Sequence, residues 1–141
     1  MRNIILVSHG EFSKGLKDSV SMIVGDLADP IRTYSLYPSC SPADYMEEMT
    51  KEILAHPEDE YVFLCDVKGG SVHSAVSRLC SHRNVVVYSG TNMNLVLDLL
   101  LSTPESLSGN TETQDRLIAS GKDGIEVLDH SRLEAGEEED F

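Results

Sequence analysis

Near its N-terminus the chain reads Asn3-Ile-Ile-Leu-Val-Ser-His-Gly10, an apolar, β-branched run that ends in polar residues and a glycine. Such a run predicts a buried strand that enters a turn, and its unbroken hydrophobicity favours a central strand of a parallel sheet. Residues 61–65 repeat the pattern and lead into Asp66-Val-Lys-Gly-Gly-Ser71, and residues 84–88 lead into Ser-Gly-Thr-Asn92. We therefore expect three buried strands with polar turns at their carboxyl ends.

Helical patterns alternate with these strands. Apolar side chains recur every three or four residues over 11–25, and Ser41-Pro42 is a typical start for a helix over 42–56. This alternation predicts an α/β fold with an open, mostly parallel sheet and helices on both faces. For such a sheet we assume the common strand order 2-1-3-4. The remaining expected elements are helices over 71–81, 93–101 and 112–120, an edge strand over 31–36 and a short final strand over 124–128, with Gly121 as a helix stop.

Length and charge narrow the class of protein. The 141 residues fit one domain, which we place at residues 1–130, followed by an acidic flexible tail at 131–141. The net charge of -13 disfavours nucleic acid and anionic membranes as partners. No apolar stretch reaches the ~20 residues of a membrane helix, and no signal-peptide pattern is present, so we expect a cytoplasmic protein.

Metal-site and disulfide patterns are missing from the sequence. The three cysteines have no C-x-x-C spacing, and the five histidines form no spacing typical of a metal site. We therefore expect neither a disulfide framework nor a metal.

The sheet order brings two polar residues together. In an open parallel sheet, ligands bind beyond the carboxyl ends of the strands where the strand order reverses, here between the strands that end before His9 and Asp66. Neighbouring strands lie ~4.8 Å apart, so the two side chains can meet at hydrogen-bond distance. A carboxylate that accepts from one imidazole nitrogen leaves the other unprotonated and directed outward. This predicts His9 as a nucleophile or a base; the alternative is a structural histidine at a strand end.

Glycine-rich turns surround this pair. Gly10 follows His9, Gly69-Gly70-Ser71 opens a helix, and Gly90 with Asn92 follows the last buried strand. Glycine turns at a helix N-terminus expose backbone N–H groups that suit a phosphoryl group, which predicts Gly10, Gly69, Gly70 and Ser71 as phosphoryl-binding residues. A capped tight turn is the simpler interpretation of Gly-Gly-Ser alone. Neither common nucleotide-binding glycine motif is present. His73, early in the expected helix, could overhang this edge of the sheet, but a histidine that faces solvent is the simpler expectation.

Four motifs in this order resemble the IIA domain of the mannose-type family of the bacterial sugar phosphotransferase system (PTS). They are Ser8-His9-Gly10, Asp66-Val-Lys-Gly-Gly-Ser71, Gly90-Thr-Asn-Met93 and Gly121-Lys-Asp-Gly-Ile125, and the resemblance covers residues 3–129. The resemblance implies that His9 accepts a phosphoryl group from HPr and passes it to a IIB component, which phosphorylates sugar at a membrane permease. It also implies that Asp66 orients His9, that Ser71 and the glycine amides hold the phosphoryl oxygens, and that no cofactor or metal is needed. A homodimer that exchanges its last, antiparallel strand is implied as well.

The chain also departs from this family and leaves other functions open. Val67-Lys68, Val72-His73-Ser74 and Asn94 differ from the family pattern at the edge that docks the partners, and the acidic tail indicates a free-standing IIA subunit. A histidine-phosphatase-like enzyme shares His9-Gly10-Glu11 but needs an arginine where Ser8 stands. A phospho-aspartate receiver domain would need acidic residues after the first strand. A phosphorylation-dependent regulatory interaction module of the same fold also fits a phosphorylated His9.

Overall fold

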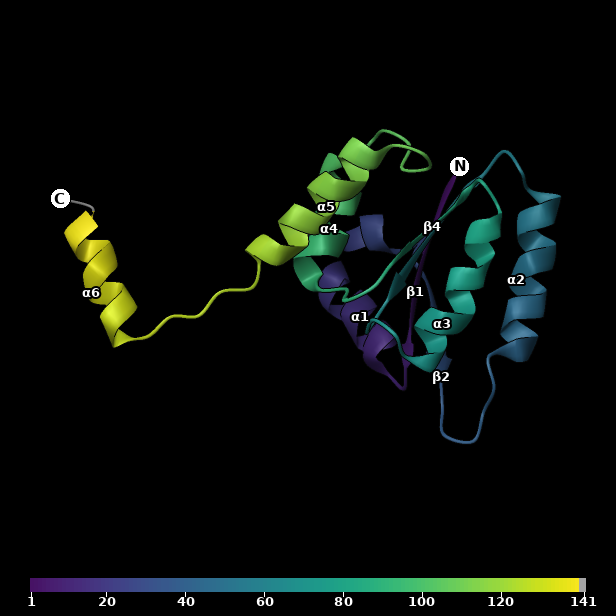
Figure 1. Ribbon diagram of the computed structural model, residues 1–141, viewed down its shortest axis with the longest axis horizontal. Helices are drawn as coiled ribbons and strands as arrows, with labels where there is room; N and C mark the ends of the chain where they lie inside the picture. The colour runs from purple at the N-terminus through teal and green to yellow at the C-terminus, as the bar shows by residue number, and fades with distance from the viewer. Residues whose placement is uncertain (140–141) are drawn as a thin grey trace.

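Four parallel strands form the centre of the molecule in the computed structural model, which describes residues 1–139 (Figure 1). The sheet order is β2-β1-β3-β4, which confirms the predicted order 2-1-3-4. All three strand pairs are parallel. The strands are β1 (Arg2–His9), β2 (Arg32–Leu36), β3 (Glu60–Cys65) and β4 (Val85–Tyr88).

Helices cover both faces of this sheet, as predicted. In Figure 1, α1, α4 and α5 lie on one side of the strands, and α2 and α3 lie on the other. The helices are α1 (Phe12–Val24), η1 (Gly25–Ala28), α2 (Ala43–Ala55), α3 (Ser71–Ser77), η2 (Arg78–Ser81), α4 (Met93–Ser102), α5 (Thr111–Asp123) and α6 (His130–Glu139).

Alternation along the strands divides the core into two. Leu6 of β1 and Leu64 of β3 face a cluster that includes Val20 of α1 and Val96 of α4. Their sequence neighbours point to the other side of the sheet, where a second cluster packs on α2 and α3: Ile5, Val7, Phe63, Cys65, Met49, Ile53, Val72 and Val76. Because β1 and β3 are buried on both faces, they need the unbroken apolar sequences that predicted them.

The predicted stop of the fifth helix at Gly121 is wrong. Helix α5 continues to Asp123, and Gly121 lies inside it. A Cβ at Gly121 would lie 3.6 Å from the Asn92 Oδ1 and Leu95 Cβ atoms. These are ordinary van der Waals distances, so Gly121 neither ends α5 nor is required for the packing of α5 on α4.

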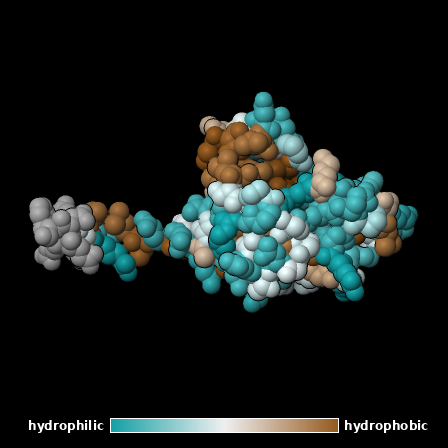
Figure 2. Space-filling model, turned by 90° about the horizontal axis from the view of Figure 1, so that it is seen from above, coloured by the Kyte–Doolittle hydropathy of each residue, from teal (hydrophilic) through white to brown (hydrophobic). Residues whose placement is uncertain are grey.

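The predicted final strand at residues 124–128 is also absent from the described chain. Gly124 forms a turn after α5, and residues 125–128 have no regular secondary structure and pair with no strand. Figure 1 shows them leading away from the body toward α6. Ile125, Val127 and Leu128 are 74%, 61% and 63% exposed, and Figure 2 shows apolar atoms along this projecting arm. A segment that points away from the sheet has no edge to pair with, so the antiparallel strand is not part of the single chain.

Helix α6 occupies most of the predicted acidic tail. Asp129 Oδ1 accepts a hydrogen bond from the backbone N–H of Arg132, 2.9 Å away, and His130 pairs with Glu134. These contacts support a first helical turn. Residues 140 and 141 of the predicted tail lie outside the described residues. Within residues 1–139, no helix combines the length and apolar character needed to cross a membrane.

Candidate functional site

His9 and Asp66 meet at the carboxyl edge of the sheet. His9 ends β1, and Asp66 follows β3 directly. Because Val7 pairs with Cys65 in the register of these strands, the two residues come to lie side by side. The Asp66 Oδ2 atom accepts two hydrogen bonds from His9, one from the backbone N–H at 2.9 Å and one from ring Nδ1 at 3.0 Å. One carboxylate oxygen therefore fixes both the main chain and the ring of His9.

The hydrogen bonds also set the charge state of the pair. Burial opposes ionisation of Asp66, but the donors on His9 and the Val67 N–H outweigh it and lower the pKa of the carboxyl group below its usual value. An ionised carboxylate only accepts hydrogen bonds, so the His9 proton resides on Nδ1. The Nε2 atom then carries a lone pair, and the His9 side chain is 46% exposed. This arrangement makes His9 a nucleophile that faces solvent.

Two residues at the start of α3 lie against the free nitrogen of His9. The Ser71 Oγ atom is 3.3 Å from Nε2, at which distance the hydroxyl donates to the unprotonated nitrogen. A Cβ at Gly70 would lie 2.9 Å from the His9 Cε1 atom, so the glycine backbone is packed on the imidazole ring. Ser71 is the first residue of α3, and Gly70 takes the N-cap position. The Ser71 hydroxyl is therefore directed to His9 and does not cap the helix.

Two other predicted phosphoryl-binding residues use their amides within the protein. The Gly10 N–H donates to the Leu36 carbonyl at 2.7 Å and so connects the turn after β1 with the end of β2. The Gly69 N–H donates to the Nδ1 atom of His73 at 2.9 Å. Both glycines thus lie at the site while their N–H groups already have partners.

The turn after β4, which contains Gly90 and Asn92, holds two helices together. Asn92 caps α4, since its Oδ1 atom accepts from the Leu95 N–H at 3.0 Å, and its Nδ2 atom donates to the Gly121 carbonyl at 2.8 Å. Both ends of this amide are used to tie α4 to α5. The turn lies at the same sheet edge, but its side chain holds the scaffold together.

Ser8 has a structural role as well. It is fully buried, and its Oγ atom accepts a hydrogen bond from the Ser13 N–H at 2.8 Å, near the start of α1. A phosphatase clamp needs an exposed cation at this position. The phosphatase interpretation therefore has no support from the structure.

A groove runs beside His9. It is open, has a volume of about 530 Å³, and is lined by His9, Gly10, Leu36, Tyr37, Pro38, Ser39 and Cys40. At its edge the Tyr37 hydroxyl donates to Glu11, and Lys14 donates to Tyr37 at 3.0 Å. These contacts with Tyr37 and Glu11 raise the pKa of Lys14, whose ammonium group places a positive charge at the groove edge. A partner that reaches His9 would meet this groove.

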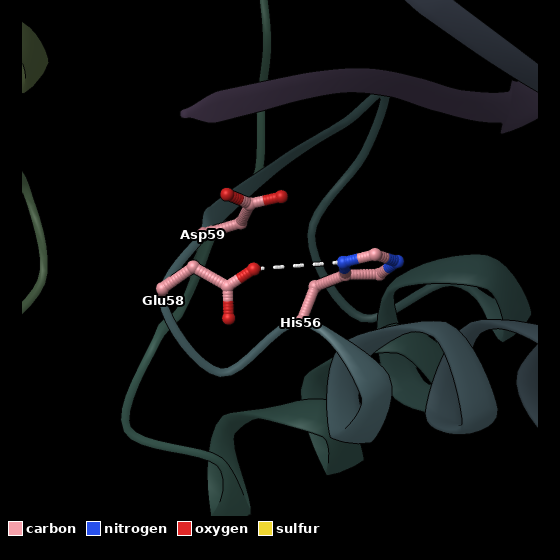
Figure 3. Close-up of side chains that lie close together, drawn as sticks. All are labelled: His56, Glu58 and Asp59. Atoms are coloured by element: carbon pink, nitrogen blue, oxygen red, sulfur yellow. Dashed lines mark ion pairs between the residues drawn. The ribbon is translucent and has the colours of Figure 1, made fainter.

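The other histidines lie elsewhere, apart from His73. His56, Glu58 and Asp59 gather at the opposite edge of the sheet, with ligand atoms within 4.8 Å of one another (Figure 3). His56 and Glu58 are exposed, and Asp59 is paired with the Met1 ammonium at 3.2 Å. Exposed groups of this kind are common without an ion, so we assign no metal to them.

Sequence reasoning missed the role of His73. It favoured a histidine that faces solvent over one that overhangs the edge of the sheet, whereas the ring is half-buried and accepts a hydrogen bond from the turn that packs on His9. The spacing of four residues between Gly69 and His73 is the signal available in the sequence, because it allows a side chain in the first helical turn to reach the preceding loop.

Known proteins share both the sequence and the fold. The family model described as "PTS system fructose IIA component" matches residues 3–114. The sorbose-specific EIIA component of the PTS from Klebsiella pneumoniae is 29% identical over 101 residues, which cover 71% of this chain and 73% of that protein. The family description thus names fructose, whereas the name of this relative specifies sorbose.

Solved structures agree with this match. The EIIA component from Streptococcus agalactiae has a TM-score of 0.76 and 25% identity, and the match covers 94% of this chain and 99% of that one. The mannose/sorbose-specific IIA subunit from Enterococcus faecalis shares the fold with a TM-score of 0.77 at 22% identity, over 91% and 95% of the two chains. Since the family model spans most of the folded body, the chain belongs to the mannose-type family of PTS IIA components, the phosphocarriers of sugar uptake.

Proposed function

We propose that His9 is the residue that carries the phosphoryl group, at its Nε2 atom. The observation that carries this proposal is the hydrogen bond from His9 Nδ1 to Asp66, which leaves Nε2 unprotonated and exposed beside the Ser71 hydroxyl. Membership in the family implies HPr as the donor and a IIB component as the acceptor. Both phosphoryl transfers, from HPr to His9 and from His9 to IIB, take place in the cytoplasm, and IIB delivers the group at the membrane permease.

The transfer follows from the geometry of these three residues. The Nε2 lone pair attacks the phosphorus of the HPr phosphohistidine, the new P–N bond forms in line with the old one, and the HPr imidazole leaves with the electron pair of the broken bond. Positive charge develops on the His9 ring, and the Asp66 carboxylate stabilises it through Nδ1–H. The Ser71 hydroxyl turns from Nε2 to a phosphoryl oxygen. Attack on the phosphohistidine of His9 by a IIB histidine reverses these roles.

Intact-mass measurement tests the assignment. The protein is incubated with phosphoenolpyruvate, enzyme I and HPr, and we expect the mass of one acid-labile phosphoryl group that depends on HPr. His9→Ala should lose this gain, while His82→Ala, a matched change at a histidine remote from the site, should retain it. A stoichiometric gain in the His9→Ala protein would show that another residue carries the group.

A second step separates transport from regulation. Phosphorylated protein, freed of HPr, is mixed with a purified mannose-family IIB domain. A phosphocarrier for uptake passes its group to IIB and returns to its unmodified mass. A regulatory module that only responds to phosphorylation would keep the label.

We propose further that the protein acts as a homodimer in which residues 124–128 pair with β4 of the partner. In support, Ile125, Val127 and Leu128 are exposed in the single chain, and β4 is an edge strand with one free row of backbone groups. An antiparallel strand added there would bury these side chains. The structure describes one chain, so the pairing itself is part of the proposal.

Light scattering tests the dimer. We expect a mass twice the 15.5 kDa of one chain. Val127→Asp should shift the equilibrium to the monomer, because it would place a charge in the new strand, whereas the neighbouring Glu126→Gln should not. A wild-type protein that is monomeric at every concentration would overturn the proposal.

A further inference from the structure

The turn from Asp66 to Ser71 determines what surrounds the free nitrogen of His9. Gly70 packs on the His9 ring, and the Ser71 hydroxyl is 3.3 Å from Nε2. A shift of this turn by 1 Å would change both the space available to a phosphoryl group and the distance to its hydroxyl donor. The position of the turn is therefore part of the reaction geometry.

The turn has little to hold it in place from its own residues. Two successive glycines have more backbone freedom than any other pair, and Gly69 adopts a φ of +80°, which a residue with a side chain rarely takes. Val67 and Lys68 are exposed. At its start the Val67 N–H donates to Asp66 Oδ1 at 3.0 Å. The glycine end of the turn therefore needs a hydrogen bond from a residue outside the turn to fix its position.

His73 supplies that contact. Its Nδ1 atom accepts a hydrogen bond of 2.9 Å from the Gly69 N–H. Within the described part of the chain, no other side chain from outside the turn bonds to the backbone of residues 67–70. Because Nδ1 accepts, the ring is neutral here and its proton lies on Nε2.

We propose that His73 is a positioning residue for phosphoryl transfer. It holds Gly69 so that Gly70 and Ser71 face His9, and it acts as a hydrogen-bond acceptor rather than as a charge. This inference rests on the proposed function of His9. It assigns a role to a residue that departs from the family pattern at this position.

Two variants of His73 test the acceptor directly. His73→Leu removes it, and the rate of phosphoryl transfer from phospho-HPr should fall about five- to tenfold, the contribution of one hydrogen bond. In His73→Asn the amide oxygen takes the place of Nδ1, so most of the rate should return. His82→Leu, a matched change at the end of η2, should leave the rate unchanged, and thermal unfolding checks that all variants are folded.

Amide hydrogen exchange at Gly69 gives a second readout. The Gly69 N–H should be protected in the wild type and in His73→Asn, and it should exchange faster in His73→Leu. The inference would be overturned if His73→Leu transferred the phosphoryl group at the wild-type rate, or if His73→Asn transferred it slowly. It would also be overturned if the Gly69 N–H of the wild type were not protected from exchange. If the wild-type protein accepts no phosphoryl group from HPr, the proposed function of His9 fails instead, and Gly69 exchange still decides whether His73 holds the turn.

Discussion

The turns after β3 and β4 share a position at the sheet edge and a glycine with positive φ, but their polar groups have opposite uses. Each lies at the carboxyl edge of the sheet, contains a glycine with positive φ (Gly69 at +80° and Gly90 at +69°), and leads into a helix. After β4, both ends of the Asn92 amide bond to the scaffold. After β3, Asp66 and Ser71 direct their polar atoms to His9. A turn becomes a site when its polar groups are directed to a reactive side chain instead of to the scaffold.

The largest expected effect comes from changing the principal polar side chain of each turn, Asp66 after β3 and Asn92 after β4. Asp66→Asn removes the negative charge and the strict acceptor that keeps the proton on Nδ1, so phosphoryl transfer from HPr should fall on the order of 10³-fold. Asn92→Ala should cost about 2 kcal/mol of stability through the lost cap and the lost bond to Gly121, with the transfer rate retained. Stopped-flow transfer and urea unfolding measure the two. Equal loss of transfer in both variants would end the contrast between the turns.

The glycines provide the second test. Gly70→Ala places a Cβ 2.9 Å from the His9 Cε1 atom at a φ of -73°, which alanine tolerates, so the ring must move and transfer should fall about 10²-fold at nearly unchanged stability. Gly90→Ala meets no atom within 4 Å but is strained by its positive φ, which should cost about 1–2 kcal/mol of stability. In transfer assays and thermal unfolding, Gly70→Ala should lose transfer and keep its stability, whereas Gly90→Ala should lose stability and keep transfer. Normal transfer by Gly70→Ala would mean that the ring has room to shift.

A smaller effect is expected at Ser71. Ser71→Ala removes the hydroxyl beside Nε2, and transfer should slow about five- to tenfold, as for one lost hydrogen bond to the phosphoryl group. Ser74→Ala, an exposed change on the same helix, is the matched control and should transfer at the wild-type rate. If both variants behave like the wild type, the hydroxyl has no part in the reaction.

The smallest effect concerns pH and stability. The folded pKa of Asp66 lies below its unfolded value of about 4. The ionised group therefore stabilises the fold above about pH 4, and this contribution is lost as the pH falls through the lowered folded pKa. The stability difference between wild type and Asp66→Asn should shrink from pH 7 to pH 3. The difference for Asn92→Ala, which removes no titrating group, should stay constant, and a parallel decline there would point to a global effect.

Strand hydrophobicity predicted the parallel sheet, and the common strand order assumed for such sheets predicted the meeting of His9 with Asp66. They did not predict which amides are free. Gly10 and Gly69 have the residue type that suits a phosphoryl group, but the direction of an N–H depends on backbone angles and on a partner such as Leu36 or His73. Gly121 was misinterpreted because a glycine that ends a helix and one that lies inside a helix look alike in sequence. The segment 124–128 has a strand pattern whose pairing depends on what lies beside it.

The two hydrogen bonds that Asp66 Oδ2 accepts from His9 have a consequence for folding. The two residues are 57 positions apart in the chain, so their contact forms only after a long loop has closed and β1 has paired with β3. A chain that has built its helices but not this central strand pair has no oriented imidazole. Its His9 ring would then react no faster than a free histidine. Phosphoryl labelling during refolding would therefore record the moment at which the centre of the sheet is complete.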